Sequence, residues 1–101
     1  MELNGAVVAV TGGSRGFGLA IATLLVEKGA RVGLIGRSAD TLAAAVTALG
    51  EDNALGISAD VSDKSAIAGA LVAINDHFGQ LDALINNAGL ARPNAIEKQL
   101  E

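Results

Sequence analysis

The sequence predicts an α/β fold with a doubly wound parallel sheet, and two observations lead to this class. Short apolar runs alternate with longer stretches in which apolar residues recur at helical spacing, and each of those stretches is followed by a glycine. Strands separated by helices of about ten or more residues are joined by right-handed crossovers and form a parallel sheet. With 50% hydrophobic residues among 101, the chain is apolar enough to form a packed core.

Four apolar runs have the length and composition of buried strands. Each is a nearly continuous run of mainly aliphatic residues, as expected where helices cover both faces of a parallel sheet. The predicted strands are Ala6–Val10, Arg31–Ile35, Ala54–Ala59 and Leu81–Asn86. With a helical stretch after each of the first three, the order is β-α-β-α-β-α-β followed by a tail.

The first predicted helix runs from Gly16 to Lys28 and is closed by Gly29, a residue typical of helix C-termini. Its large apolar residues recur at helical spacing, which favours one apolar stripe. These residues are Phe17, Ile21, Leu24 and Leu25.

The second and third predicted helices each follow a serine that can cap the first turn and stop at a glycine. Ser38 and Gly50 bound the second helix, and Ser62 and Gly79 bound the third. The apolar stripe of the second is Leu42, Val46 and Leu49, and that of the third is Ile67, Leu71, Ile74 and Phe78.

The crossovers fix the expected layout of the sheet. The doubly wound pattern predicts strand order 3-2-1-4, with the switch point between the first and fourth strands. The first two helices then cover one face, and the third helix lies alone on the other. We expect one domain at residues 1–89, which stops after the fourth strand, and a tail at residues 90–101 that starts the next helical segment.

Composition excludes several classes of function. The net charge is −4 with no basic run, so nothing favours nucleic-acid binding. The chain has no cysteine, which excludes disulfides and thiolate metal sites. The first residues lack a secretory pattern, and the apolar runs are too short to span a membrane. We therefore expect a cytoplasmic domain without a metal site, in which His77 has a structural place in the last turn of its helix.

A glycine-rich turn follows the first predicted strand and opens the first helix. Residues 11–18 read T-G-G-S-R-G-F-G, with Gly12, Gly16 and Gly18 as the key glycines. Glycine lets the backbone approach a pyrophosphate, and the helix N-terminus supplies free N–H groups and a positive dipole end. A lone glycine triplet also occurs in ordinary tight turns. Its position inside a β-α-β unit favours a nucleotide site of the Rossmann type.

The end of the second strand predicts which dinucleotide binds. Sites for NAD place an acidic residue there to accept from the ribose 2′-hydroxyl. Here that position is Gly36, and Arg37 follows it. A guanidinium would hold an adenosine 2′-phosphate, and Arg15 in the glycine turn could reach the same group. The alternative is two solvated surface arginines. The pattern favours NADP(H).

Residues 86–89, N-N-A-G, end the fourth strand on the other side of the switch point. Two adjacent asparagines alone would indicate only a turn. Together with T-G-x-x-x-G-x-G, and with Asp60-Val61 after the third strand, they resemble the short-chain dehydrogenase/reductase family over nearly the whole chain. The resemblance implies a Rossmann-like domain, and it implies that Thr11 and Asn86 tie the first and fourth strands together.

The resemblance also implies the residues around an NADP(H) cofactor. The pyrophosphate and adenosine ribose would lie against Gly12, Ser14, Arg15, Gly16, Phe17 and Gly18, with Arg37 on the 2′-phosphate and Ser38 beside it among the cofactor-binding residues. Asp60 and Val61 would face the adenine. Asn87, Ala88 and Gly89 would lie along the ribose nearer the nicotinamide.

No catalytic residue is expected in this chain. Relatives would move a hydride between nicotinamide and a carbonyl or alcohol using a Ser, a Tyr and a Lys, and this sequence has no Tyr. The chain alone is therefore expected to be inactive, as the cofactor-binding fragment of an NADP(H)-dependent oxidoreductase. Two alternatives remain, a non-catalytic nucleotide-binding module and a remnant that acts only by associating with another chain. We also expect self-association through the open sheet edge.

Overall fold

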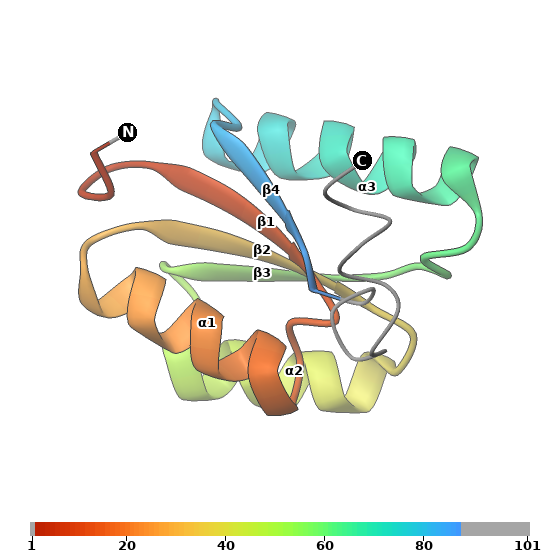
Figure 1. Ribbon diagram of the computed structural model, residues 1–101, viewed down its shortest axis with the longest axis horizontal. Coiled ribbons are helices and arrows are strands. Elements are labelled where there is room, and N and C mark those ends of the chain that lie inside the picture. Colours follow the sequence, from red (N-terminus) through yellow and green to blue (C-terminus); the bar gives the residue numbers. More distant parts are fainter. Residues whose placement is uncertain (1, 88–101) are drawn as a thin grey trace, which may run out of the picture.

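The computed structural model describes residues 2–87, which form four strands and three helices in the predicted order (Figure 1). Each element lies within two residues of its predicted position. The elements are β1 (Val7–Thr11), α1 (Gly16–Glu27), β2 (Arg31–Gly36), α2 (Ala39–Leu49), β3 (Ala54–Ser58), α3 (Lys64–Phe78) and β4 (Ala83–Asn86).

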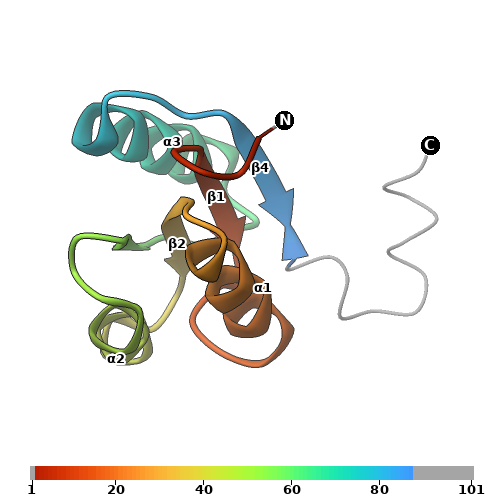
Figure 2. The ribbon, with the colours of Figure 1, turned by 90° about the vertical axis from the view of Figure 1, so that its left-hand side faces the viewer.

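The four strands form one parallel sheet in the order β3-β2-β1-β4, which confirms the doubly wound prediction. In the central pairs, Val8 lies opposite Val32 on one side and Ala83 on the other. Within residues 2–87, β4 pairs with β1 alone and forms one edge of the sheet (Figure 2). The carboxyl ends of β1 and β4 therefore lie side by side at the predicted switch point.

The helices lie in two layers, as predicted. Figure 1 shows α1 and α2 on one face of the sheet and α3 on the other. One core, between the sheet and α1 and α2, is centred on Val8, Val10, Val32, Leu34 and Leu42. The other core, under α3, is centred on Val7, Ala9, Ile35, Ala70 and Ile74. At 15 residues α3 is the longest helix of the described part, in which no helix has the length and apolar character needed to cross a membrane.

The buried face of α1 differs from the predicted stripe. Phe17 is 78% exposed and Leu24 57% exposed, whereas Gly18 and Ala22 are buried. The helix turns its smallest residues toward the sheet because Gly18 packs directly on the backbone of Gly12. The close contact between the backbones of Gly18 and Gly12 therefore sets which side of α1 faces the sheet, although larger apolar side chains stay exposed.

The cap of α3 also differs from the prediction by one residue. Asp63, not Ser62, is the N-cap, and its Oδ1 accepts hydrogen bonds from the backbone N–H groups of Ser65 and Ala66. Ser62 instead donates both its backbone N–H and its hydroxyl to Asp60. Both residues are good N-caps, and the bonds to Asp60 leave the cap to Asp63.

The start of β4 is tied to β1 by a carboxylate. The predicted strand began at Leu81, but strand pairing begins at Ala83, and the backbone N–H of Asp82 just before it donates to the carbonyl of Val7 at 2.8 Å. Oδ2 of Asp82 accepts from the backbone N–H of Val7 at 2.8 Å and from Nε2 of Gln80 at 2.7 Å. The Val7 hydrogen bond, and then that of Gln80, hold the pKa of Asp82 below its ordinary value.

Acidification is therefore expected to weaken the β1–β4 pairing. A carboxyl whose pKa is lowered by folding stabilises the fold above its unfolded pKa of about 4, and this stability is lost as the pH falls through the folded value. Urea unfolding followed by circular dichroism between pH 7 and pH 3 should show a smaller acid loss for Asp82→Asn than for the wild type. The exposed Asp76 of α3 provides the control variant Asp76→Asn, which makes the same charge change. Equal acid losses in all three proteins would contradict the prediction.

Candidate nucleotide-binding site

A cavity of about 230 Å3 lies where the carboxyl ends of β1 and β2 meet the first turn of α2. It is bounded by the glycine turn, by the end of β2, by the start of α2 and by the segment after β3. The lining residues are Gly12, Ser14, Arg15, Gly36, Arg37, Ser38, Thr41 and Val61. All of them except Gly36 and Thr41 belong to the set chosen from the sequence as cofactor-binding residues.

The glycine turn has the backbone that a close ligand approach requires. Gly12 and Gly16 have φ values of 66° and 59°, in the left-handed region that side chains disfavour. The N–H of Gly12 donates to the carbonyl of Ile35 at 2.7 Å, which fixes the turn to β2. A Cβ on Gly18 would collide with the carbonyl oxygen of Gly12. The turn therefore packs tightly on the first residues of α1, and its residues Gly12, Ser14 and Arg15 line the cavity.

Two guanidinium groups stand at the cavity, one from the glycine turn and one from the end of β2. Arg15 is exposed, and the side chain of Arg37 is 76% exposed. The carbonyl of Arg37 accepts a hydrogen bond from the hydroxyl of Ser58 at 2.9 Å. Nη2 of Arg37 lies 3.2 Å from Oδ2 of Asp60. The last residue of β3 therefore holds the backbone of Arg37, and the loop after β3 holds its side chain.

Asp60 sits behind Arg37 and does not line the cavity. The backbone N–H of Ser62, then its hydroxyl, and then Arg37 hold the pKa of Asp60 below its ordinary value. The carboxylate is therefore ionised at neutral pH. Water and salt screen an exposed pair of this kind, so it orients Arg37 without removing it from use.

Three hydroxyl groups of the lining, those of Ser14, Ser38 and Thr41, lie close together. The Thr41 hydroxyl lies 3.2 Å from Oγ of Ser14 and 3.1 Å from the carbonyl oxygen of Ser38. The Ser38 hydroxyl accepts from the backbone N–H of Thr41 at 3.3 Å, which confirms Ser38 as the cap of α2. Thr41 was not chosen from the sequence. Its one signal there is its place three residues after the cap, inside the first turn of α2.

The asparagines after β4 join the site to the sheet. The Thr11 hydroxyl donates to Oδ1 of Asn86 at 2.9 Å, which confirms the tie between β1 and β4. Asn87 is buried, and its Nδ2 donates to the carbonyl of Gly12 at 3.4 Å. Ala88 and Gly89, the other predicted residues of this motif, lie outside the described residues.

The other predicted residues of the glycine turn do not line the cavity. Gly18 is buried beneath the turn, while Gly16 and Phe17 are exposed beside it. Phe17 therefore presents its ring to solvent and not to the space between Arg15 and Arg37.

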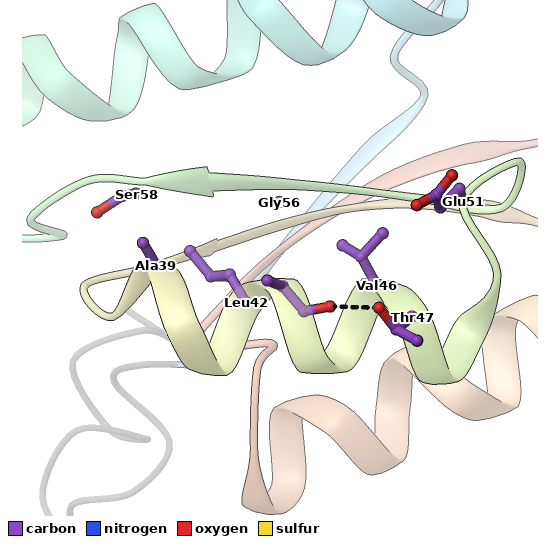
Figure 3. Close-up of a pocket in the computed structure, with 8 residues that line it drawn as sticks. Ala39, Leu42, Val46, Thr47, Glu51, Gly56 and Ser58 are labelled. Carbon is purple, nitrogen blue, oxygen red and sulfur yellow. Dashed lines mark hydrogen bonds between the residues drawn. The ribbon is translucent and has the colours of Figure 1, made fainter.

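A larger cavity, of about 470 Å3, lies between α2 and the outer edge of β3 (Figure 3). Its wall includes Leu42, Val46 and Gly56, and none of the predicted site residues lines it. The Thr47 hydroxyl there already donates to the carbonyl of Ala43 at 3.0 Å. Without the glycine turn or an arginine, this groove lacks the groups that hold a phosphate.

The smaller cavity has the size of a site for part of a dinucleotide. Sites for whole drug-sized ligands have volumes of about 300–1,000 Å3, so 230 Å3 matches a part of such a molecule. At the end of β2, Gly36 adds no side chain to the cavity, and a Cβ there would make only an ordinary contact with Oγ of Ser14 at 3.5 Å. Arg15, Arg37 and the hydroxyls are donors suited to a phosphate.

Comparison with known proteins agrees with this geometry. The family model described as "short chain dehydrogenase" matches residues 6–101. The chain is 46% identical over 96 residues to the 3-oxoacyl-(acyl-carrier-protein) reductase FabG of Vibrio harveyi, covering 95% of this chain and 39% of the relative. It is 37% identical over 105 residues to human 15-hydroxyprostaglandin dehydrogenase (NAD+), covering 100% of this chain and 40% of that protein.

A solved structure supports the same relationship. The crystal structure of a short chain dehydrogenase from Bacillus anthracis superposes with a TM-score of 0.78 at 34% identity, over 84% of this chain and 35% of that one. The chain thus spans about two fifths of the length of the curated relatives it matches. With a family model that covers nearly all of the sequence and a parallel sheet in the same order as the predicted one, the chain belongs to the short-chain dehydrogenase family.

Proposed function

We propose that this chain binds the adenosine 2′-phosphate end of NADP(H) for an oxidoreductase that interconverts carbonyl and alcohol groups. The cofactor supplies or accepts a hydride, which carries its electron pair to or from the substrate carbon, while a proton goes to or leaves the oxygen. The residues described here bind and orient the nucleotide. The chain has no tyrosine, so a phenolic proton donor is not among its 101 residues.

The proposal depends on one observation above all, the charge of the cavity wall. Arg15 and Arg37 line the cavity, and its lining residues include no Asp or Glu. At the end of β2, where an acid would select the 2′-hydroxyl of NAD, the structure has Gly36. A dianionic 2′-phosphate would meet donors in this lining, and the Asp60 carboxylate beside Arg37 is outside the lining.

Family membership by itself does not choose between the two dinucleotides. One of the relatives above is named as an NAD(+) enzyme. The choice of NADP(H) is therefore carried by Gly36, Arg15 and Arg37. Relative to these, Gly12 and Gly18 would serve either cofactor, since they shape the turn that faces the pyrophosphate.

Calorimetric titration with NADP+ and NAD+ tests the proposal. A charge-assisted hydrogen bond stabilises a complex by about 1.5–3 kcal/mol, so NADP+ should bind about tenfold or more tightly than NAD+. In Arg37→Ala, this preference should fall by about tenfold, while the affinity for NAD+ should change little.

Arg31→Ala is the matched control, because it removes the same charge from the opposite end of β2. Its guanidinium lies 5.6 Å from the ring centre of Phe78, away from the cavity. The preference of this variant should equal that of the wild type. Equal affinities of the wild type for the two nucleotides, no detectable binding, or equal effects of the two substitutions would each refute the proposal.

Self-association through the β4 edge stays a prediction, and the exposure of Leu84 supports it. Leu84 is 46% exposed on the face of the sheet that α3 covers. Such an edge is a template for pairing with another strand. Light scattering on freshly purified chain should show oligomers, and Leu84→Lys should reduce them. A monodisperse wild-type monomer would contradict this.

We propose the cytoplasm as the compartment of this protein. The chain has no cysteine, so it cannot form the disulfides that an oxidising compartment favours.

A further inference from the structure

Thr41 occupies a position in the cavity that none of the sequence motifs explains. It lies in the first turn of α2, it is half-buried, and its side chain lines the cavity. Its hydroxyl bridges Ser14 of the glycine turn, at 3.2 Å, and the carbonyl oxygen of Ser38, at 3.1 Å. Thr41 therefore links the glycine turn to the start of α2, two chain segments that both line the cavity.

The protons of these groups constrain how the bridge works. A threonine hydroxyl has one proton, and a carbonyl oxygen can only accept. If Thr41 donates to Ser38, then the contact with Ser14 requires the Ser14 hydroxyl to donate to Thr41. If Thr41 donates to Ser14, the Ser14 proton is available to a ligand in the cavity. In both arrangements Thr41 holds the oxygen of Ser14, but only the second leaves the Ser14 proton for a phosphate.

We propose that Thr41 is a positioning residue that sets the preference for a 2′-phosphorylated nucleotide, by donating to the Ser14 oxygen and so leaving the Ser14 hydroxyl to donate toward the phosphate position. This rests on the proposed function. A phosphate would stand among Arg15, Arg37 and the Ser14 hydroxyl, and each hydrogen bond to it is strong only if its donor is already oriented. An unphosphorylated ribose makes no such demand on Ser14.

The decisive variants change the Thr41 hydroxyl at nearly constant volume. Thr41→Val replaces the hydroxyl by a methyl group, which removes the partner of Ser14. The affinity for NADP+ should fall about three- to tenfold, as expected for one lost hydrogen bond, while the affinity for NAD+ should stay within about twofold. Thr41→Ser keeps the hydroxyl and should keep the wild-type preference.

Thr47→Val is the matched control within the same helix. The Thr47 hydroxyl donates to the carbonyl of Ala43 in the preceding turn, outside the nucleotide cavity. This variant should bind both nucleotides like the wild type, and thermal unfolding followed by circular dichroism should compare its stability with that of Thr41→Val. Ser14→Ala gives an independent route if Thr41→Val does not fold. It should lower the affinity for NADP+ by more than the affinity for NAD+.

The outcomes separate this inference from the function on which it rests. If the wild type prefers NADP+ and loses the preference in Arg37→Ala but keeps it in both Thr41→Val and Ser14→Ala, the role of Thr41 is overturned and the proposed function stands. A parallel loss for both nucleotides in Thr41→Val would show a merely structural residue and would also overturn it. If the wild type shows no preference, the proposed function fails and this inference with it.

Discussion

Replacing Gly18 with alanine is expected to abolish nucleotide binding and to destabilise the fold. A Cβ at this position would collide with the carbonyl oxygen of Gly12 and lie 2.8 Å from Cα of Gly13. These are backbone atoms, so no side-chain rotation can relieve the contact. The turn must move, and with it the bond from Asn87 to the carbonyl of Gly12. We expect a loss of about 1–3 kcal/mol in the free energy of unfolding.

Gly69→Ala is the matched control, because Gly69 also lies inside a helix. Nothing lies within 4 Å of a Cβ built at Gly69, which is exposed on α3. Removing glycine from a helix interior should stabilise the chain by about 0.5–1 kcal/mol. Urea unfolding and titration with NADP+ measure both variants. Retained nucleotide affinity in Gly18→Ala would show that the tight turn is not needed for binding.

The layout of the sheet could be predicted because it depends on periodicity. The apolar runs at β1 and β2 and the glycines after the helices are local signals, and the crossover rule then leaves few topologies. The strand order and the distribution of helices over the two faces followed. Gly12 and Arg37 were also predicted as site residues, and both line the cavity. They follow neighbouring parallel strands, whose carboxyl ends lie at the same edge of the sheet.

The misjudged residues are those whose place depends on contacts between distant segments. Hydrophobicity ranks Phe17 above Gly18 as a buried residue, but the collision of a Gly18 side chain with the turn reverses that order. Ser62 is not the cap of α3, because its backbone N–H and its hydroxyl are both hydrogen-bonded to Asp60. Thr41 has no motif, and its meeting with Ser14 appears only once the glycine turn and α2 are in place.

In the core between the sheet and α3, the largest stability effect is expected from Ile74→Ala. Ile74 is fully buried, and it is the largest buried side chain that α3 contributes to the core under it. Its truncation should lower the free energy of unfolding by about 2–5 kcal/mol, because the sheet cannot collapse into the space. For a domain of this size the melting temperature should fall by roughly 10 °C or more. Val72→Ala on the same helix, at a side chain 59% exposed, should change stability by about 0.5 kcal/mol or less.

The core depends on Ile74 because this side chain packs against Gly33 of β2. Gly33, in the middle of β2, has no side chain, and a Cβ there would collide with Cδ1 of Ile74. Gly33→Ala alone should therefore destabilise the chain by about 1–3 kcal/mol through overpacking. In the double variant the new methyl group takes space that Ile74→Ala has vacated. The two losses should then fall short of additivity by about 0.5–3 kcal/mol in a double-mutant cycle measured by urea unfolding. Strictly additive losses would mean that α3 does not rest on Gly33 through this side chain.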